Sequence, residues 1–146
     1  MEWIEEQVSS ILSQKSISIE IFISVDLSND KTHEWCQDLA GKNAHVKVLP
    51  YGEKFGGAAK NFFRLIRDVD FSCFDYVALS DQDDIWDSSK LHHAIRTIEQ
   101  DSLDGYSSDV TAFWSDGQER LVKKSFPQKR FDYFFEAAGP GCAYVF

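Results

Sequence analysis

The chain has 146 residues, of which 43% are hydrophobic and 27% are charged, and its net charge is −9. These values are ordinary for a soluble globular domain, and they exclude a disordered tail, a collagen-like repeat and a low-complexity array. The acidic charge argues against a nucleic-acid partner, because phosphate contacts need clustered Lys and Arg. No apolar run approaches the roughly 18–20 residues that span a bilayer, so we expect no transmembrane segment.

Apolar spacing predicts that helices and strands alternate along the chain. Apolar residues three or four apart indicate helices, and alternation or a continuous apolar run indicates strands. In order, we expect a helix over 3–14, a strand over 18–25, a helix over 31–40, a strand over 44–49, a helix that opens at 56–57, a strand over 74–80, a helix capped by Asp87 or Ser88, a strand over 106–115, a polar connection over 116–129, a short helix with Phe131, Phe134, Phe135 and Ala138, and a strand over 142–146. The helix that opens at 56–57 should bury a stripe made of Ala58, Phe62, Leu65, Ile66 and Val69.

This alternation indicates a single α/β domain over residues 1–146, with a mainly parallel sheet flanked by helices. Ligands of such sheets bind beyond the carboxyl ends of the strands. Carboxylates follow two of the expected strands: Asp26 comes after the first, and Asp81, Asp83 and Asp84 come after the third. We therefore expect the functional site at this edge of the sheet.

Three carboxylates within four residues, Asp81, Asp83 and Asp84, repel one another at neutral pH, and water screens them less beside a buried strand. A divalent cation relieves this repulsion, and Mg²⁺ or Mn²⁺ binds carboxylate oxygens together with substrate phosphates. The pattern is therefore typical of a site for a metal ion and a diphosphate. The alternative is a solvated acidic turn that caps the following helix.

Two other kinds of site also use closely spaced acids. A calcium-binding EF-hand loop needs Gly at its sixth position and Glu at its twelfth, where this chain has Trp86 and His92, so that site is excluded. A phosphatase of the haloacid dehalogenase type places Asp-x-Asp after an apolar strand and uses the first Asp as nucleophile. Such an enzyme normally has Thr or Val where this chain has Ile85, and it stays a minor alternative.

The three cysteines, Cys36, Cys73 and Cys142, are widely spaced and odd in number. This spacing supports neither a disulfide framework nor a zinc site. We expect buried thiols in a reducing compartment.

Several segments, in order, resemble the family 2 glycosyltransferases of the GT-A fold (a Rossmann-like fold), and their rhamnosyltransferase-like branch in particular. The segment LSDQDDIWDSSKL is close to the Asp-Gln-Asp-Asp-x-Trp metal motif of that branch. The other similar segments are EEQVSSILSQ with SIEIFISVDLSNDKT, FGGAAKNFFRLI, and AAGPGCAYVF. The motif DQDDIW is fairly specific, and the ordered set, which covers nearly the whole chain, is more so.

The resemblance implies metal-dependent transfer of a sugar such as rhamnose from a dTDP- or UDP-linked donor to a saccharide or lipid-linked saccharide acceptor. It also implies a cofactor, Mg²⁺ or Mn²⁺, and a cytoplasmic place at the inner membrane face, in cell-surface polysaccharide biosynthesis. The residues that it assigns are, for the nucleotide sugar, Asp26, Lys60, Asp81 and Asp83; for the metal, Asp81 and Asp83; and for the acceptor side, Asp84 and Trp86.

The chain also departs from the family pattern. Val25 and Leu27 stand where the family often has Asp and Gly, which bears on the nucleoside contacts. The family's first strand, central in a 3-2-1-4 strand order, has no counterpart, so the strands at 18–25 and 74–80 should pair directly or leave a gap. The chain stops at Phe146, before the region of the family's catalytic base, so the catalytic residue is unassigned. We expect a partial domain, truncated at both ends, and an inactive remnant or binding module is the alternative.

Overall fold

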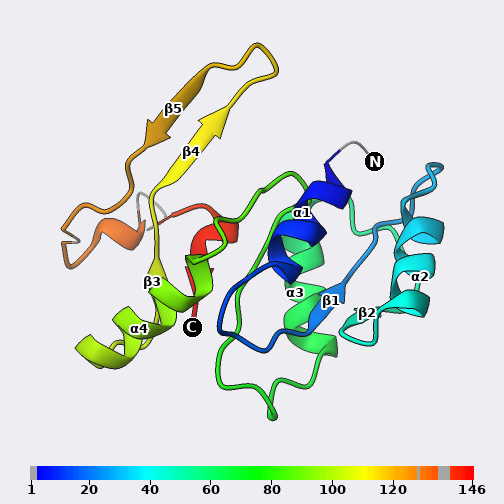
Figure 1. Cartoon of the computed structure of the whole chain (residues 1–146), viewed down its shortest axis with the longest axis horizontal. Coiled ribbons are helices and arrows are strands. Elements are labelled where there is room, and N and C mark those ends of the chain that lie inside the picture. The colour runs from blue at the N-terminus through cyan, green and yellow to red at the C-terminus, as the bar shows by residue number, and fades with distance from the viewer. Residues whose placement is uncertain (1–2, 128, 135–138) are drawn as a thin grey trace.

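The computed structural model describes residues 3–127, 129–134 and 139–146. Helices and strands alternate through the first half, as the sequence predicts, and short strands dominate the second half (Figure 1). The elements are α1 (Ile4–Leu12), β1 (Ile21–Ile23), α2 (Thr32–Lys42), β2 (Val46–Val48), α3 (Ala58–Asp68), α4 (Lys90–Asp101), β3 (Tyr106–Ser107), β4 (Val110–Phe113), β5 (Glu119–Val122), the 3-10 helices η1 (Asp132–Phe134) and η2 (Gly141–Ala143), and β6 (Tyr144–Val145). Within these ranges, no helix has the length and apolar character needed to cross a membrane.

The strands form three separate two-stranded ladders. β1 and β2 pair in parallel, with Ile21 opposite Val46, whereas β3 pairs with β6 and β4 with β5 in antiparallel fashion. The β1–α2–β2 segment is the strand–helix–strand unit that parallel pairing requires. The described residues therefore show the expected α/β alternation, but only this one pair of strands is parallel, and a mainly parallel sheet is not seen.

Residues 74–80 pair in a way that the sequence does not predict. Among the described residues, their bridge joins Ala78 to Val145 and is antiparallel. Beside that bridge, Val77 and Phe146 exchange two backbone hydrogen bonds of 2.7 and 3.0 Å, and the Leu79 N–H donates to the Tyr144 carbonyl at 3.3 Å. The segment is extended, but its partner is the end of the chain rather than a parallel strand.

A gap separates β1 from residues 76–80. In the described part of the chain, β1 pairs only with β2. A cavity of about 690 Å³ lies between β1 and residues 76–80, and its lining includes Ile19 and Ile21 on one side and Tyr76 and Ala78 on the other. Of the two arrangements expected without a central strand, the structure therefore has the gap.

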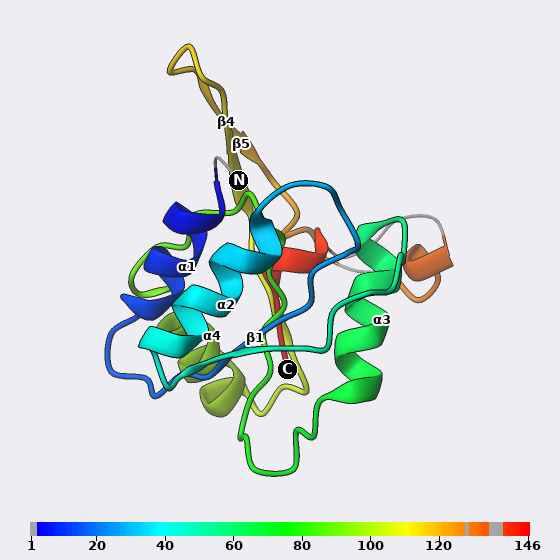
Figure 2. The ribbon, with the colours of Figure 1, turned by 90° about the vertical axis from the view of Figure 1, so that its right-hand side faces the viewer.

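Helix α1 contributes to two apolar clusters. Ile11 packs with the cluster of α4 and β6, whereas Ile4 and Val8 pack with the cluster of β1 and α2, around the fully buried Cys36. In Figure 2, α1 and α4 lie on one side of β1 and α3 lies on the other. The helix thus joins two halves of the molecule that no strand ladder joins within the described residues.

Polar side chains on α1 and just after it complete this connection. The Gln7 side chain donates to the Ser80 hydroxyl at 2.7 Å and to the Asp81 carbonyl. Ser10 Oγ accepts from the Trp86 N–H at 2.9 Å. Gln14 Oε1 accepts from the Leu91 N–H at 3.0 Å. Because both Gln side chains are buried, these bonds replace water at the junction.

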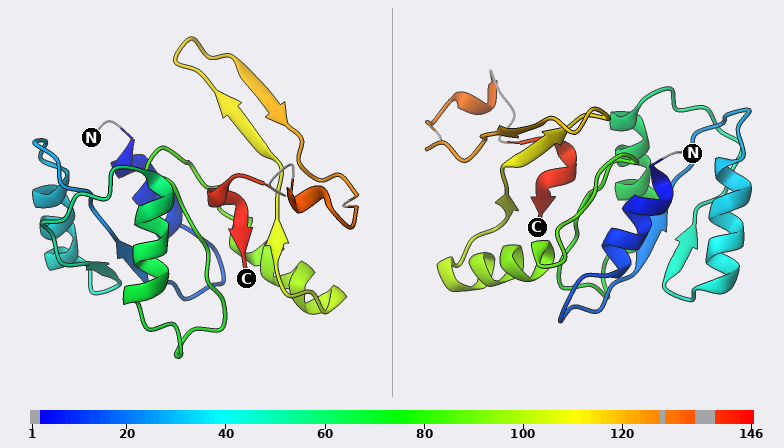
Figure 3. Two further views of the ribbon diagram at one scale, coloured as in Figure 1. Left: turned by 180° about the vertical axis from the view of Figure 1, so that it is seen from behind. Right: turned by 45° about the horizontal axis from the view of Figure 1, so that its top comes forward.

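The second half contains a hairpin that the sequence does not predict. The expected strand over 106–115 is divided into β3 and β4, and β5 lies within the expected polar connection. The hairpin β4–β5 projects away from the rest of the molecule (Figures 1 and 3). Gly117, in the left-handed region at φ 83°, lies in its turn, where a side chain would be strained. At the hairpin base, the Asp109 carboxylate accepts from the N–H groups of Lys124 at 2.6 Å and Ser125 at 2.7 Å.

The last elements agree only in part with expectation. Of the helix expected around 131–138, the structure shows η1 (Asp132–Phe134), and the predictions for Phe135 and Ala138 lie outside the described residues. The expected strand over 142–146 is reduced to β6 because η2 occupies its start.

The buried face of α3 also differs from the predicted stripe. Ile66, expected inside, is 47% exposed, whereas Arg64 is only 5% exposed. The Arg64 guanidinium donates to Ser24 Oγ at 3.1 Å and to the Pro50 carbonyl, and it lies 4.9 Å from the centroid of the Phe55 ring. These partners offset the cost of burying the charge.

The cysteines are all free, but one is not buried as expected. Cys36 and Cys142 are buried, whereas Cys73 is exposed in the segment before residues 74–80. Burial raises the pKa of the Cys36 thiol to about 11.

Candidate functional site

A cavity of about 630 Å³ lies where β1 and residues 76–80 end. It is lined from β1 by Ser24 and Asp26, and from the other segment by Ser80, Asp81 and Asp83. The first turn of α3 adds Gly57, Ala58 and Asn61. The structure thus brings together three of the carboxylates that the sequence singles out, at the carboxyl ends of two extended segments.

Asp26 holds the loop that precedes α3. Its carboxylate accepts the backbone N–H groups of Phe55 and Gly56, each at 2.7 Å. These bonds stabilise the charged form and lower the pKa of Asp26. Gly56 has φ 73°, so only a residue without a Cβ adopts this loop conformation readily. Asp26 therefore fixes one wall of the cavity while its side chain lines it.

A small network connects β1 to α3 at the same wall. The Ser24 hydroxyl donates to Asn61 Oδ1 at 2.6 Å, and Asn61 Nδ2 donates to the Ser24 carbonyl at 3.3 Å. Arg64 donates to the same hydroxyl from the next turn of α3. The network orients Asn61 at the cavity through local hydrogen bonds to Ser24.

The acidic cluster forms a tight turn. The Asp81 N–H donates to Asp84 Oδ2 at 3.1 Å, and the Asp84 N–H points back to the Asp81 carbonyl at 3.4 Å. Burial raises the pKa of Asp81, and the negative charges of Asp84 and Asp83 raise it further. The turn therefore holds like charges together at a partly buried position.

The donor atoms of this turn fit a hard divalent cation. Single ligand atoms of Asp81, Asp84 and Cys142 lie within 4.8 Å of one another. Burial and the neighbouring carboxylates raise the pKa of the Cys142 thiol to about 12, so the thiol stays protonated and offers no thiolate. Carboxylate oxygens remain, and these are the ligands that Mg²⁺ and Mn²⁺ prefer. As ligands for such a cation, the geometry favours Asp81 and Asp84. Asp83 is exposed and lines the first cavity.

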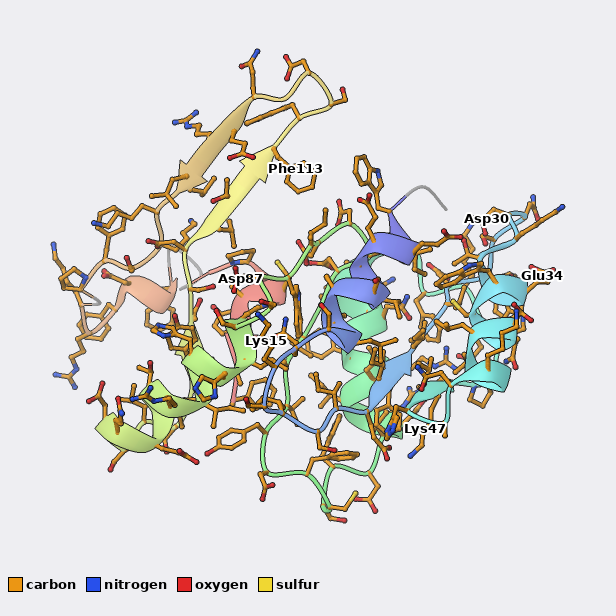
Figure 4. The ribbon with its side chains drawn as sticks, viewed as in Figure 1. Lys15, Asp30, Glu34, Lys47, Asp87 and Phe113 are labelled. Carbon is orange, nitrogen blue, oxygen red and sulfur yellow. The ribbon has the colours of Figure 1, made fainter. Side chains whose placement is uncertain are left out.

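A second cavity, of about 730 Å³, lies on the other side of the acidic turn. Its lining includes Asp84, Trp86 and Lys90 from the turn and α4, and Phe113 and Trp114 from the hairpin. Figure 4 shows Phe113 on the hairpin and Asp87 near the start of α4. Of the residues assigned to the acceptor side by resemblance, both Asp84 and Trp86 therefore lie at this cavity, while Asp26, Asp81 and Asp83 line the first.

Lys90 is a residue of the second cavity that the sequence analysis overlooks. Its Nζ lies 3.6 Å from the centroid of the Trp86 ring and donates to the Cys142 carbonyl at 2.7 Å. Burial lowers the pKa of Lys90 to about 8. Trp86 itself packs in the core at 7% exposure, and its Nε1 has no partner among the described residues. The spacing of Trp86 and Lys90, four residues apart, is the signal that could have suggested this contact.

Lys60 lies elsewhere. It is exposed in the first turn of α3, next to Asn61, and does not belong to the lining of either cavity. Its assigned contact with the nucleotide sugar stays a prediction.

Comparison with known families now decides the classification. The model of the family "Glycosyl transferase family 2" matches residues 2–140. The chain belongs to this family. Membership confirms the resemblance seen in DQDDIW and its companion segments, and it implies the GT-A fold.

Within glycosyl transferase family 2, the chain is similar to a rhamnosyl transferase. The chain is 50% identical over 144 residues to the dTDP-rhamnosyl transferase RfbG of Shigella flexneri. The alignment covers 98% of this chain and 50% of the relative, so the chain spans half the length of that protein.

Proposed function

We propose that this domain binds a dTDP-linked sugar, dTDP-rhamnose by likeness to its relative, and takes part in its transfer to a saccharide acceptor in polysaccharide synthesis. The observation that carries this proposal is the shared lining of one cavity by Asp26, Asp81 and Asp83 at two strand ends. Likeness to a rhamnosyl transferase at 50% identity supports the choice of sugar. A UDP-linked sugar is the other donor to be tested.

In this proposal the first cavity holds the donor. Asp26 and Asn61 offer hydrogen-bond acceptors and a donor to the nucleoside, and Lys60 approaches from the first turn of α3. Asp81 and Asp83, with Asp84 added by its geometry, would hold Mg²⁺ or Mn²⁺. When bound, such an ion would neutralise charge on the diphosphate leaving group. This explains how a chain of net charge −9 can accept an anionic donor.

The second cavity then receives the acceptor. Phe113 and Trp114 are exposed and supply aromatic faces, Trp86 lines the cavity from the core, and Asp84 and Asp87 supply carboxylates. Aromatic faces with hydrogen-bonding groups around them suit the apolar faces and hydroxyls of a saccharide, free or lipid-linked. The three free thiols agree with a reducing, cytoplasmic location for the domain.

Isothermal calorimetry with dTDP and MnCl₂ tests the donor site. We expect binding heat with the intact chain and at least a tenfold loss of affinity in Asp83→Ala, because the diphosphate then loses a group that offsets its charge. The matched control is Asp101→Ala, which removes an exposed carboxylate at the far end of α4. The same titrations with UDP decide between the two nucleotides.

The outcomes separate the alternatives. No heat with either nucleotide and the intact, folded chain would favour an inactive remnant or a binding module of another kind. Release of inorganic phosphate from small phosphoesters, abolished by Asp81→Asn, would instead indicate the phosphatase.

A further inference from the structure

Strand β5 of the hairpin has an open edge on the outside of the molecule. Within the residues that the structure describes, β5 pairs with β4 alone. β4 is the strand nearer to α1, where its Phe113 meets the Trp3 ring, and β5 lies on the outer side of the hairpin (Figures 1 and 3). Leu121 of β5 is 62% exposed. An exposed strand edge of this kind offers its backbone groups to another strand.

The register of the hairpin decides which residues of β5 face this edge. The Trp114 N–H donates to the Gln118 carbonyl at 3.0 Å across the turn, so these two residues point toward each other. Because alternate residues of a strand direct their backbone groups to opposite edges, the residues two and four positions after Gln118 also face β4. The N–H and C=O groups of Glu119, Leu121 and Lys123 therefore face the open edge.

The side chains of the same three residues are complementary to a second copy of themselves. Glu119, Leu121 and Lys123 alternate along the strand, so they share one face, and all three are exposed. Neither Glu119 nor Lys123 forms an ion pair with a described residue, and the Lys123 Nζ lies 5.3 Å from the centroid of the exposed Phe126 ring. The two opposite charges are equally far from Leu121 along the chain. An antiparallel copy centred on Leu121 therefore places each Glu119 opposite a Lys123.

Backbone and side chains select the same register. In an antiparallel pair of identical strands, outward-facing residues meet one another only where the twofold axis passes through a residue. An axis at any charged residue of the strand sets like charges directly opposite each other, and an axis at Val122 sets Arg120 opposite Lys124. An axis at Leu121 sets opposite charges against each other and Arg120 against Val122. Charge complementarity thus favours this one register.

We propose that two copies of this chain associate through β5, antiparallel and centred on Leu121, and form a four-stranded sheet from the two hairpins. Each facing pair of outward residues then exchanges two backbone hydrogen bonds. Charges on an edge strand commonly prevent pairing with other proteins, and here their signs match a copy of the same strand. The inference does not depend on sugar transfer, although Glu119 also lines the second cavity.

Sedimentation velocity of the 146-residue chain tests the proposal through its charges. We expect a weak dimer that forms between about 10 µM and about 1 mM, because a contact between two strand edges is small. Glu119→Lys alone and Lys123→Glu alone each set like charges opposite each other, and each should weaken dimerisation about tenfold. An equal mixture of the two variants sets every Lys opposite a Glu, so it should restore the wild-type affinity as a heterodimer. The matched controls are Glu53→Lys and Lys31→Glu, at exposed residues elsewhere.

Disulfide cross-linking tests the register, in a Cys73→Ser background that removes the exposed thiol. In the proposed dimer the two Leu121 Cα atoms lie about 5.5 Å apart, which is within the reach of a disulfide. Leu121→Cys should therefore cross-link two chains on oxidation. Thr111→Cys is the control, because Thr111 is exposed and lies opposite Leu121 on β4. Three strand spacings, about 14 Å, would separate it from its copy, so it should not cross-link.

The two experiments can each overturn the proposal. It fails if the wild-type chain stays monomeric over the whole concentration range, or if the mixture of the two charge variants does. It also fails if both single charge variants dimerise as the wild type does, because the interface then lies elsewhere. Cross-linking of Thr111→Cys as readily as Leu121→Cys would contradict the register. Far-UV circular dichroism checks that each variant is folded.

Discussion

Asp81 is the residue at which folding and the proposed cation binding would have opposite requirements. Its pKa is raised by burial first and by the Asp84 and Asp83 charges next, so the folded chain disfavours the ionised form. Below the ordinary pKa of an Asp, both the folded and the unfolded chain hold the proton, so this group does not change folding stability. As pH rises above that value, the unfolded chain ionises more readily, so folding stability falls. At neutral pH this cost is present unless a cation offsets it.

We therefore expect Asp81→Asn to raise the thermal midpoint at pH 7, with the difference from the wild type vanishing near pH 3. MnCl₂ should raise the midpoint of the wild type and leave that of the variant unchanged. Differential scanning calorimetry at the two pH values measures both effects. Asp101→Asn is the control, and an equal response of that variant to Mn²⁺ would show that the cation acts elsewhere.

Lys90 has the opposite pH dependence. Its pKa is lowered to about 8, so the folded chain releases a proton that the unfolded chain keeps. The contribution of Lys90 to folding stability therefore rises as pH increases from about 8 toward the ordinary pKa near 10.5. Lys90→Met keeps the stem over Trp86 but cannot titrate. We expect urea midpoints of the variant to fall relative to the wild type between pH 8 and 10. Lys31→Met, at an exposed lysine, should show no such trend.

At the level of elements, a residue just beyond the end of α1 caps another helix. No side chain at the N-cap of α4 bonds to the first turn of that helix, and the Leu91 N–H is instead accepted by Gln14 Oε1 at 3.0 Å. Unsatisfied N–H groups at helix starts are costly when buried. Gln14 therefore acts as an N-terminal cap of α4, a role that a local Ser or Asp side chain has in most helices.

We expect Gln14→Ala to lower the free energy of unfolding by about 1–3 kcal/mol, the range for leaving one buried hydrogen-bonding group unpaired. Ser13→Ala on the neighbouring residue, which is exposed and whose hydroxyl donates to the nearby Ser10 carbonyl, should stay within about 0.5 kcal/mol of the wild type. Urea unfolding followed by far-UV circular dichroism measures both. Equal values for the two variants would contradict the capping role.

Local sequence patterns predict helices and strands better than they predict which distant residues come into contact. The spacing of Ile4, Val8 and Ile11 predicts α1, and the structure confirms it. The contact between Gln14 and Leu91 joins residues 77 positions apart, so no periodicity reveals it. β5 is missed because Glu119 and Arg120 are exposed, and a strand with no buried face has no apolar alternation.

The candidate site follows the same division. The sequence predicts that Asp26, Asp81 and Asp83 lie together because each follows an expected strand, and the three residues line one cavity in the structure. The nearness of Asp84 to Cys142 depends on the return of the chain end to residues 76–80, which is a tertiary fact. The buried position of Arg64 likewise depends on Ser24 and Pro50, which lie on segments far away in sequence.

At the scale of the whole molecule, the cysteines report folding of each half. Cys36 lies in the cluster of β1 and α2, Cys142 lies beside the acidic turn, and Cys73 is exposed between them. We expect one thiol to react with Ellman's reagent in native buffer and three in guanidinium, with the two buried thiols at least about a hundredfold slower in native buffer. Cys73→Ser should remove the fast phase. A fast phase that remains in this variant would show that one half opens alone.

The hydrogen bonds of Asp109 at the base of the β4–β5 hairpin have a further consequence for the second cavity. Asp109 holds the return strand through Lys124 and Ser125, and the pKa of Asp109 is lowered by these backbone bonds. Farther out, Phe113 meets the Trp3 ring edge-on at 5.9 Å. The hairpin residues Phe113 and Trp114 line the second cavity, so the position of that wall depends on a carboxylate at the base of the hairpin. Loss of the Asp109 side chain is therefore expected to loosen a wall that lies several residues away along both strands.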